Sequence, residues 1–157
     1  MSKIKRKQFA TYIQAQTSTP SYVLLGTDLE ELSIEMNANV VKTANILGET
    51  SVSIDKYEKQ SSVEPFKADS GDDLFTWLKE IIDGDQTLSD LETNVVHVDL
   101  YATPTVDAYP AYKENVVVEV VSYGGNTEAF QIPFNIHYTG VRVAGTFNPT
   151  TKTFTAA

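Results

Sequence analysis

Apolar and polar side chains alternate over several segments of this chain, as in β-strands whose two faces meet different surroundings. The pattern is strongest from Lys113 to Phe154, where turns are expected at residues 124–126 and 148–151 and a bend or bulge at Gly140. One face of this segment is predicted to carry Phe130, Ile132, Phe134, Ile136 and Tyr138. The other face is predicted to carry Gln131, Asn135, His137 and Thr139. The C-terminal part should therefore be a block of antiparallel strands.

A second alternating segment is predicted to be a single strand from Leu32 to Val40. Its apolar face consists of Leu32, Ile34, Met36, Ala38 and Val40. Its polar face consists of Glu31, Ser33, Glu35, Asn37 and Asn39. A slip of one residue would invert both faces, so the register should be well specified. A further strand is expected from Asn94 to Ala102, whereas residues 103–112 contain two prolines and should be a surface loop rather than a central strand.

The stretch from Gly48 to Ser62 is polar and charged, and we expect a long hairpin or a protruding loop there. Loops of this length in compact domains are usually functional or mobile. Its large apolar residues are Val52, Ile54 and Tyr57, and the alternation of the first two indicates pairing with another surface in an assembly. A solvent-exposed loop without a partner is the simpler alternative.

One amphipathic helix is predicted over about residues 71–83, with Asp69 or Ser70 as its N-cap and Gly84 as its C-terminal stop. Its apolar side should pack on the sheet and place Trp77 in the core rather than on a ligand platform. That side consists of Leu74, Phe75, Trp77, Leu78, Ile81 and Ile82. Residues 1–157 are therefore predicted to form one mainly β domain, an antiparallel β-sandwich or split barrel with one flanking α-helix.

Composition narrows the possible functions. The chain has 157 residues, a net charge of −9 and no cysteine, which excludes disulfides, thiolate metal sites and a cysteine nucleophile. No apolar run approaches the roughly 20 residues that a membrane-spanning helix needs. The acidic body should repel nucleic acid rather than bind it tightly.

Residues 1–20 have weak periodicity and are predicted to form an N-terminal arm. The arm begins with a basic cluster of Lys3, Lys5, Arg6 and Lys7. No apolar segment of a signal peptide follows, so export by that route is not expected. The cluster is interpreted either as a solvated arm or as an arm that docks on an acidic neighbouring copy.

Catalytic motifs are missing from the sequence, and we expect no enzyme activity, cofactor or metal. It contains no phosphate-binding glycine loop and no nucleophile elbow. His97, Asp99 and His137 could form a two-histidine, one-carboxylate metal site. Hydrogen-bonded surface or interface histidines are the commoner arrangement. Arg142 should lie on a polar face, in a surface ion pair or in a pair across a subunit boundary.

The order of these elements resembles that of the major tail (tail tube) proteins of long-tailed bacteriophages, particularly those of Gram-positive hosts. The resemblance spans roughly residues 8–155. Its most telling pieces are the PFKADSGDDLF junction before and into the helix, and the G-x-R-x-x-G-T-F segment from Gly140 to Phe147. Neither piece is a catalytic motif.

The resemblance implies a structural virion protein that is assembled in the host bacterial cytoplasm. In this family six subunits close into a ring, each lends strands to an inner β-barrel, and rings stack into a tube through which double-stranded DNA leaves. Expected partners are further copies of the chain and the tail tip or initiator, tape measure and terminator proteins. A contractile tail, a secretion-system tube or a phage-like bacteriocin could use a similar subunit.

Within that frame, we expect an acidic lumen that lets DNA slide, with Glu31, Glu35 and Glu119 as candidate lumen-facing residues. The arm, the 48–62 loop and Arg142 are the candidate inter-subunit contacts. Deletion of residues 50–60 is expected to leave a folded subunit that forms no tubes. The alternative is a non-catalytic β-sandwich binding module for carbohydrate or adhesion, in which Tyr101, Tyr109 and Tyr112 stack on sugar rings.

Overall fold

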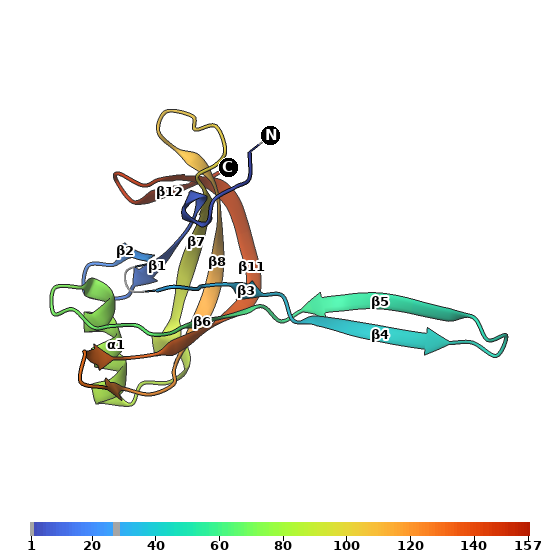
Figure 1. Ribbon diagram of the computed structural model, residues 1–157, viewed down its shortest axis with the longest axis horizontal. Coiled ribbons are helices and arrows are strands. Elements are labelled where there is room, and N and C mark those ends of the chain that lie inside the picture. Colours follow the sequence, from blue (N-terminus) through green and yellow to red (C-terminus); the bar gives the residue numbers. More distant parts are fainter. Residues whose placement is uncertain (1, 27–28) are drawn as a thin grey trace.

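The computed structural model describes residues 2–26 and 29–157, and its main element is an eight-stranded antiparallel sheet (Figure 1). The strand order is β2-β1-β7-β8-β11-β6-β3, with β12 paired to β11. The bounds are β1 (Phe9–Ala15), β2 (Ser21–Leu25), β3 (Ile34–Glu35), β6 (Gln60–Val63), β7 (Glu92–Asp99), β8 (Tyr109–Val120), β11 (Phe134–Asn148) and β12 (Thr153–Ala156). The predicted fold class, mainly β and antiparallel with one flanking α-helix, is confirmed.

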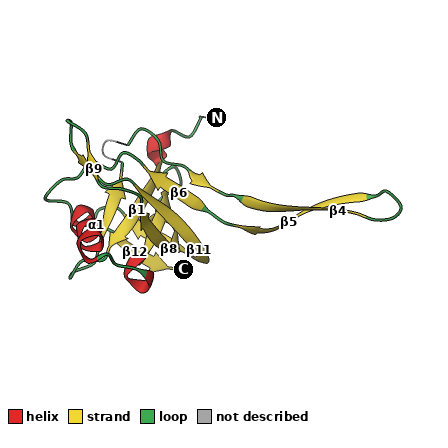
Figure 2. Ribbon diagram, turned by 90° about the horizontal axis from the view of Figure 1, so that it is seen from below, coloured by secondary structure: helices red, strands yellow, loops and turns green. Residues whose placement is uncertain are grey.

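Two smaller antiparallel pairs extend from this sheet. The longer is a hairpin of β4 (Ala38–Ala44) and β5 (Thr50–Tyr57), which projects from the body in both views (Figures 1 and 2). The shorter is β9 (Gly124–Gly125) with β10 (Phe130–Gln131). Two 3₁₀ turns, η1 (Arg6–Gln8) and η2 (Leu88–Leu91), lead into β1 and β7.

The hydrophobic core is divided between the two faces of the central strands. On β7, Val95 belongs to a larger cluster under the helix, whereas the adjacent Val96 belongs to a smaller cluster near β12. Adjacent residues of a strand point to opposite faces, so the sheet is covered on one face at one end and on the other face at the other end. The larger cluster includes Ile13, Leu74, Trp77, Val118, Phe134 and Ile136. The smaller cluster includes Ala10, Tyr12, Val98, Ala111 and Phe147.

The helix α1 (Asp73–Gly84) packs its apolar side on the larger cluster, as predicted. Trp77 is only 2% exposed and is a core residue. The N-cap is Asp72, whose Oδ1 accepts the Leu74 N–H at 3.0 Å, so the expectation of Asp69 or Ser70 is wrong. The Asp69 carboxylate instead accepts from Gly71 in the preceding turn. Asp85, in the left-handed region at φ 45°, ends the helix one residue beyond the expected Gly84.

The predicted break at Gly140 is confirmed as a bulge in β11. Gly140 has φ 94°, and the register with β8 shifts between Tyr138 and Arg142. Over this interval β11 advances four residues while β8 advances only two, from Val116 to Glu114. The bulge therefore brings Arg142 opposite Glu114.

Three expectations about the strands are wrong. Residues 9–15 are not part of an arm but form β1, which is buried on both faces between β2 and β7. Pro110 lies inside β8, opposite Thr146 of β11, where β8 has passed the end of its pairing with β7. The predicted strand from Leu32 to Val40 is broken at Asn37, whose φ of 47° turns the chain out of the sheet and into β4.

Candidate functional site

The β4–β5 hairpin is the most unusual surface feature of the molecule, because every residue of both strands is exposed. An isolated two-stranded hairpin is at best marginally stable in water. The predicted protruding segment, residues 48–62, covers only the second half of this hairpin and runs into β6, which belongs to the main sheet. The error has a simple cause: the first three residues of β4 belong to the alternating segment 32–40, which resembles a core strand.

The two faces of the hairpin differ in chemistry. Cross-strand pairing places Val40 opposite Ile54 and Val52 opposite Lys42, which makes one face largely apolar. The other face is tied by polar contacts between side chains. These contacts join Asn39 Nδ2 to Asp55 Oδ1 and Thr43 Oγ1 to Ser51 Oγ, both at 2.6 Å. Two pairs of side chains on the polar face therefore bond each other, whereas the apolar face lacks a cover within the described chain.

The tip of the hairpin is apolar as well. Ile46 and Leu47 are 101% and 76% exposed, in a turn that Asn45 holds by accepting the N–H groups of Leu47 and Glu49. Exposed apolar residues on such a projection are typical of a protein contact surface. All three of the predicted inter-subunit residues in this segment, Val52, Ile54 and Tyr57, lie exposed on β5.

Two contacts join the strands of the hairpin at its root. The Asn37 carbonyl accepts the Glu58 N–H at 3.3 Å, and the Asn37 side chain donates to the Glu58 carbonyl at 3.0 Å. The next residue, Lys59, enters the main body. Its carbonyl accepts the Tyr138 N–H at 3.1 Å, and its ammonium forms a salt bridge with Glu114.

Glu114 is the centre of a buried polar cluster on the face of the sheet that also carries the larger core. It is 3% exposed, and its second carboxylate oxygen lies 3.5 Å from His97 Nε2. His97 contacts the Tyr138 hydroxyl at 2.9 Å through the same ring nitrogen, and Thr11 Oγ1 at 3.1 Å through Nδ1. The cluster thus joins β1, β7, β8, β11 and the residue that follows the hairpin.

The sequence analysis did not predict this cluster, although the position of Glu114 in its strand indicated a buried charge. Glu114 precedes Val116, Val118 and Val120 at a spacing of two residues. Its charged side chain therefore lies on the same face of the strand as these apolar residues. A carboxylate at such a position needs a partner, because burying an unpaired charge is strongly unfavourable. The partners lie far away in the sequence, 55 residues in the case of Lys59.

Burial shifts the pKa values of two members of the cluster, His97 and Tyr138. It lowers the pKa of His97 from its ordinary value of 6.5 to about 4, with a further contribution from the positive charges of Lys59, Arg142 and Arg6. Burial likewise raises the pKa of Tyr138 above its ordinary value. At neutral pH, His97 is therefore a neutral hydrogen-bonding group.

Stability should consequently depend on pH through His97. The unfolded chain takes up this proton near pH 6.5 and the folded chain only near pH 4, so acidification favours unfolding across this window. At about 1.4 kcal/mol per pH unit, the free energy of unfolding should fall by about 3 kcal/mol. Urea titrations of wild type and H97Q at intervals from pH 7 to pH 4 measure this. The wild type should show the extra loss, and parallel curves for both proteins would contradict the assignment.

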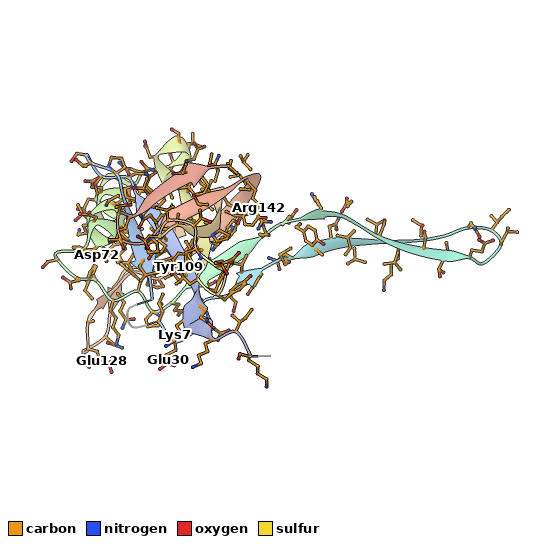
Figure 3. The ribbon with its side chains drawn as sticks, turned by 90° about the horizontal axis from the view of Figure 1, so that it is seen from above. Lys7, Glu30, Asp72, Tyr109, Glu128 and Arg142 are labelled. Atoms are coloured by element: carbon orange, nitrogen blue, oxygen red, sulfur yellow. The ribbon has the colours of Figure 1, made fainter. Side chains whose placement is uncertain are left out.

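Arg142 pairs within its own chain in the structure. Its guanidinium lies over the Tyr112 ring at 3.7 Å, and its Nε is 4.0 Å from Glu114 Oε1. Its side chain is half exposed, on the side of the body where the hairpin begins (Figure 3). These contacts account for Arg142 within one subunit, while a contact across a subunit boundary stays a prediction.

Two of the three candidate lumen residues share one exposed face of the main sheet. Glu35 on β3 lies in one row with Gln60 and His137, and Glu119 on β8 lies in the neighbouring row with Asn135. Glu31, the third candidate, is exposed but precedes β3 and lies outside the strands. This face is therefore polar, and its fixed charges at Glu35 and Glu119 are negative.

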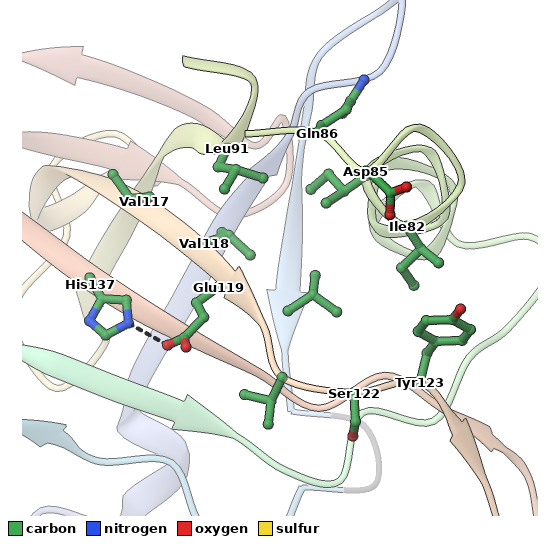
Figure 4. A pocket seen from close by; sticks show the side chains of 13 residues that line it. Ile82, Asp85, Gln86, Leu91, Val117, Val118, Glu119, Ser122, Tyr123 and His137 are labelled. Atoms are coloured by element: carbon green, nitrogen blue, oxygen red, sulfur yellow. Dashed lines mark hydrogen bonds and ion pairs between the residues drawn. The ribbon is translucent and has the colours of Figure 1, made fainter. Parts of the chain in front are cut away.

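Glu119 and His137 form a contact pair at the edge of a groove (Figure 4). His137 Nε2 lies 2.7 Å from Glu119 Oε1, and this hydrogen bond, with a second from Asn135, lowers the pKa of the Glu119 carboxyl. The groove measures about 750 Å³ and runs between this face and the end of α1. Its lining is mainly apolar and includes Ile82 and Val121.

The possible metal site does not form. His97 is buried in the Glu114 cluster, whereas His137 lies on the exposed polar face with Glu119. Among residues 2–26 and 29–157, no three His, Cys, Asp or Glu side chains converge in a way that could hold a metal ion. Both histidines take the commoner role of hydrogen-bonded groups.

The N-terminal arm is shorter than predicted and partly attached to the body. Arg6 donates to the carbonyls of Phe9 at 2.5 Å and of Leu32 at 3.0 Å. Lys3, Lys5 and Lys7 are exposed, and Met1 lies outside the described residues. The three lysines are the exposed basic part of the arm, whereas Arg6 holds the arm against the chain before β3.

The tyrosines considered for a sugar-binding surface do not share one face. Tyr109 and Tyr112 are three residues apart on β8, so they point to opposite sides of the strand. Tyr109 packs against the smaller core cluster, and the Arg142 guanidinium covers one face of the Tyr112 ring. Tyr101 is half exposed in the turn after β7.

Neither a protein-family model nor a curated protein matches this chain. Within the part of the chain that the structure describes, no helix combines the length and the apolarity needed to cross a membrane.

Proposed function

We propose that this protein is a self-assembling structural subunit of a bacteriophage tail tube, in which hexameric rings stack into a conduit for the genome. The observation that carries the proposal is the β4–β5 hairpin, which extends into solvent with one apolar face and an apolar tip. Such a hairpin gains its stability from a neighbour. A further copy of the same chain is the neighbour that a tube supplies.

Two other surfaces support the same proposal. The main sheet ends in β2 on one side and in β3 and β12 on the other, so both edges offer backbone groups for pairing with adjacent subunits. Closure of the sheets of six subunits into a ring would cover these edges. The polar face that carries Glu35 and Glu119 would then line the lumen, where negative charge lets DNA slide instead of holding it by counterion release.

The chemistry of the hairpin predicts which of its faces an assembly buries. I54E should prevent tube formation, because it places a carboxylate on the apolar face, opposite Val40. S53E, at the neighbouring position on the polar face, should be tolerated. An unpaired charge buried at an interface costs about 2–5 kcal/mol, which corresponds to more than a tenfold loss of association.

Sedimentation and electron microscopy of the two variants at equal concentration provide the measurement. Both residues are exposed and adjacent on β5, so the subunits should have equal thermal stability. Tubes from I54E at wild-type yield would show that the apolar face is not a contact surface.

A further inference from the structure

We infer that Lys59 and Glu114 form a positioning pair that fixes the direction in which the β4–β5 hairpin leaves the body. Its significance for assembly rests on the proposed function, but the pair itself is a property of one subunit. The inference follows from the way in which the hairpin is attached.

Among the residues that the structure describes, none packs along the hairpin in a way that would orient it. All residues from Ala38 to Tyr57 are exposed, and the internal contacts of the hairpin hold its two strands to each other rather than to the sheet. The Asn37–Glu58 hydrogen bonds at the root likewise join strand to strand. The direction of the hairpin is therefore decided by the residues on either side of this root.

Lys59 is the first residue after the root with contacts to the body, and it is held at three points. Its carbonyl accepts the Tyr138 N–H, its ammonium lies 5.3 Å from the centre of the Tyr138 ring, and the same ammonium bonds Glu114. A lysine held by backbone and side chain together cannot rotate independently of the sheet. The orientation of β5, which precedes Lys59, is therefore fixed relative to the sheet.

Glu114 forms a rigid partner for this lysine. It lies on β8 in the middle of the sheet and is flanked by His97 on β7 and Arg142 on β11. The bulge at Gly140 places Arg142 opposite Glu114. Three strands therefore determine the position of the carboxylate before Lys59 approaches it.

Stability alone does not explain a charge pair at this depth. Replacement of a buried ion pair by apolar residues of similar volume is often neutral or stabilising, and the best-attested role of such pairs is to specify one arrangement among several. The pair lies beside the root of the hairpin, so the arrangement that it would specify is the direction of the hairpin.

Distances between spin labels on isolated subunits test the inference. The natural chain has no cysteine, so labels attach only at introduced positions. L47C marks the hairpin tip and T150C marks the turn between β11 and β12, and both sites are exposed. Double electron–electron resonance would be recorded in this labelled background and with each of E114Q, K59M, K59R and K56M added.

We expect one narrow distance distribution for the labelled parent and a broad or displaced one for E114Q and K59M. K59R should restore the narrow distribution, because it keeps the charge and the donors. K56M is the matched control, since it removes an exposed ion pair with Glu58 at the same root and should leave the distribution narrow. If E114Q does not fold, the comparison of K59M with K59R tests the inference instead. In K59M, Glu114 keeps Arg142 as a charged neighbour, so this variant should still fold.

Unchanged, narrow distributions in both E114Q and K59M would overturn the inference. The proposed function is tested separately. It is rejected if the unlabelled wild type never forms tubes, whatever the distance distributions are. It survives if tubes form while K59M leaves the hairpin direction unchanged, in which case only the positioning role is rejected.

Discussion

A variant in which a two-residue turn replaces most of the β4–β5 hairpin is expected to fold normally and to form no tubes. Ala38 and Tyr57 are cross-strand partners, so an Asn-Gly turn can join them in place of residues 39–56. No residue of either core cluster is removed. Assembly should be lost completely, because the proposed contact with a further copy of the chain is gone.

These bounds differ from the deletion of residues 50–60 that the sequence suggested. That deletion would also remove Lys59 and Gln60, which belong to the junction with the body and to β6. Its effect on folding and its effect on assembly could not be separated. Thermal unfolding and negative-stain microscopy of the shorter replacement separate them, and normal tubes from this variant would reject the role of the hairpin.

The second large effect is expected in the core, where F134A should lower the free energy of unfolding by about 3–5 kcal/mol. Phe134 is 1% exposed, and its ring meets the Phe66 ring edge-on with 5.8 Å between centroids. Removal of the ring leaves a cavity between β11 and the segment after β6. Such a loss is a large fraction of the stability of a typical domain.

F130A is the matched control for this substitution. The alternation of residues 130–138 placed both phenylalanines on one buried face, but Phe130 is 41% exposed on β10, before Pro133 and the start of β11. F130A should therefore cost about 1 kcal/mol or less. Chemical denaturation of both variants gives the comparison, and equal losses would show that the two rings are equally buried.

Elements with a strong local signal could be predicted from the sequence. The helix followed from apolar residues at helical spacing, and its buried side is the predicted one. The bulge at Gly140 and the final turn followed from residues that favour special backbone geometry. In that turn, Asn148 accepts N–H groups from Thr150 and Thr151, as an Asx turn requires.

Central strands were harder to predict, because alternation disappears where both faces are buried. β1 reads FATYIQA and is buried on both sides, so it has no polar face and resembled an arm. The opposite error occurred at β4, where clear alternation suggested a core strand. Alternation shows only that two faces differ, and in the hairpin both of them are exposed.

The Glu114 cluster could not be assembled from the sequence, because its members come from five separate segments. Thr11 and His97 are 86 residues apart, and His97 and Tyr138 are 41 apart. Only the sheet order and the register, including the bulge, bring them together. The acidic face could be predicted only in part for the same reason. Glu35 and Glu119 share a face, whereas Glu31 lies outside it.

Negative-stain electron microscopy of the purified wild-type protein, with light scattering across concentration, tests the central claim most directly. We expect rings or hollow tubes with sixfold end views, either spontaneously or after addition of a tail-tip complex that initiates polymerisation. Single subunits at every concentration, which also fail to polymerise on such a complex, would contradict the proposal and favour a monomeric binding module.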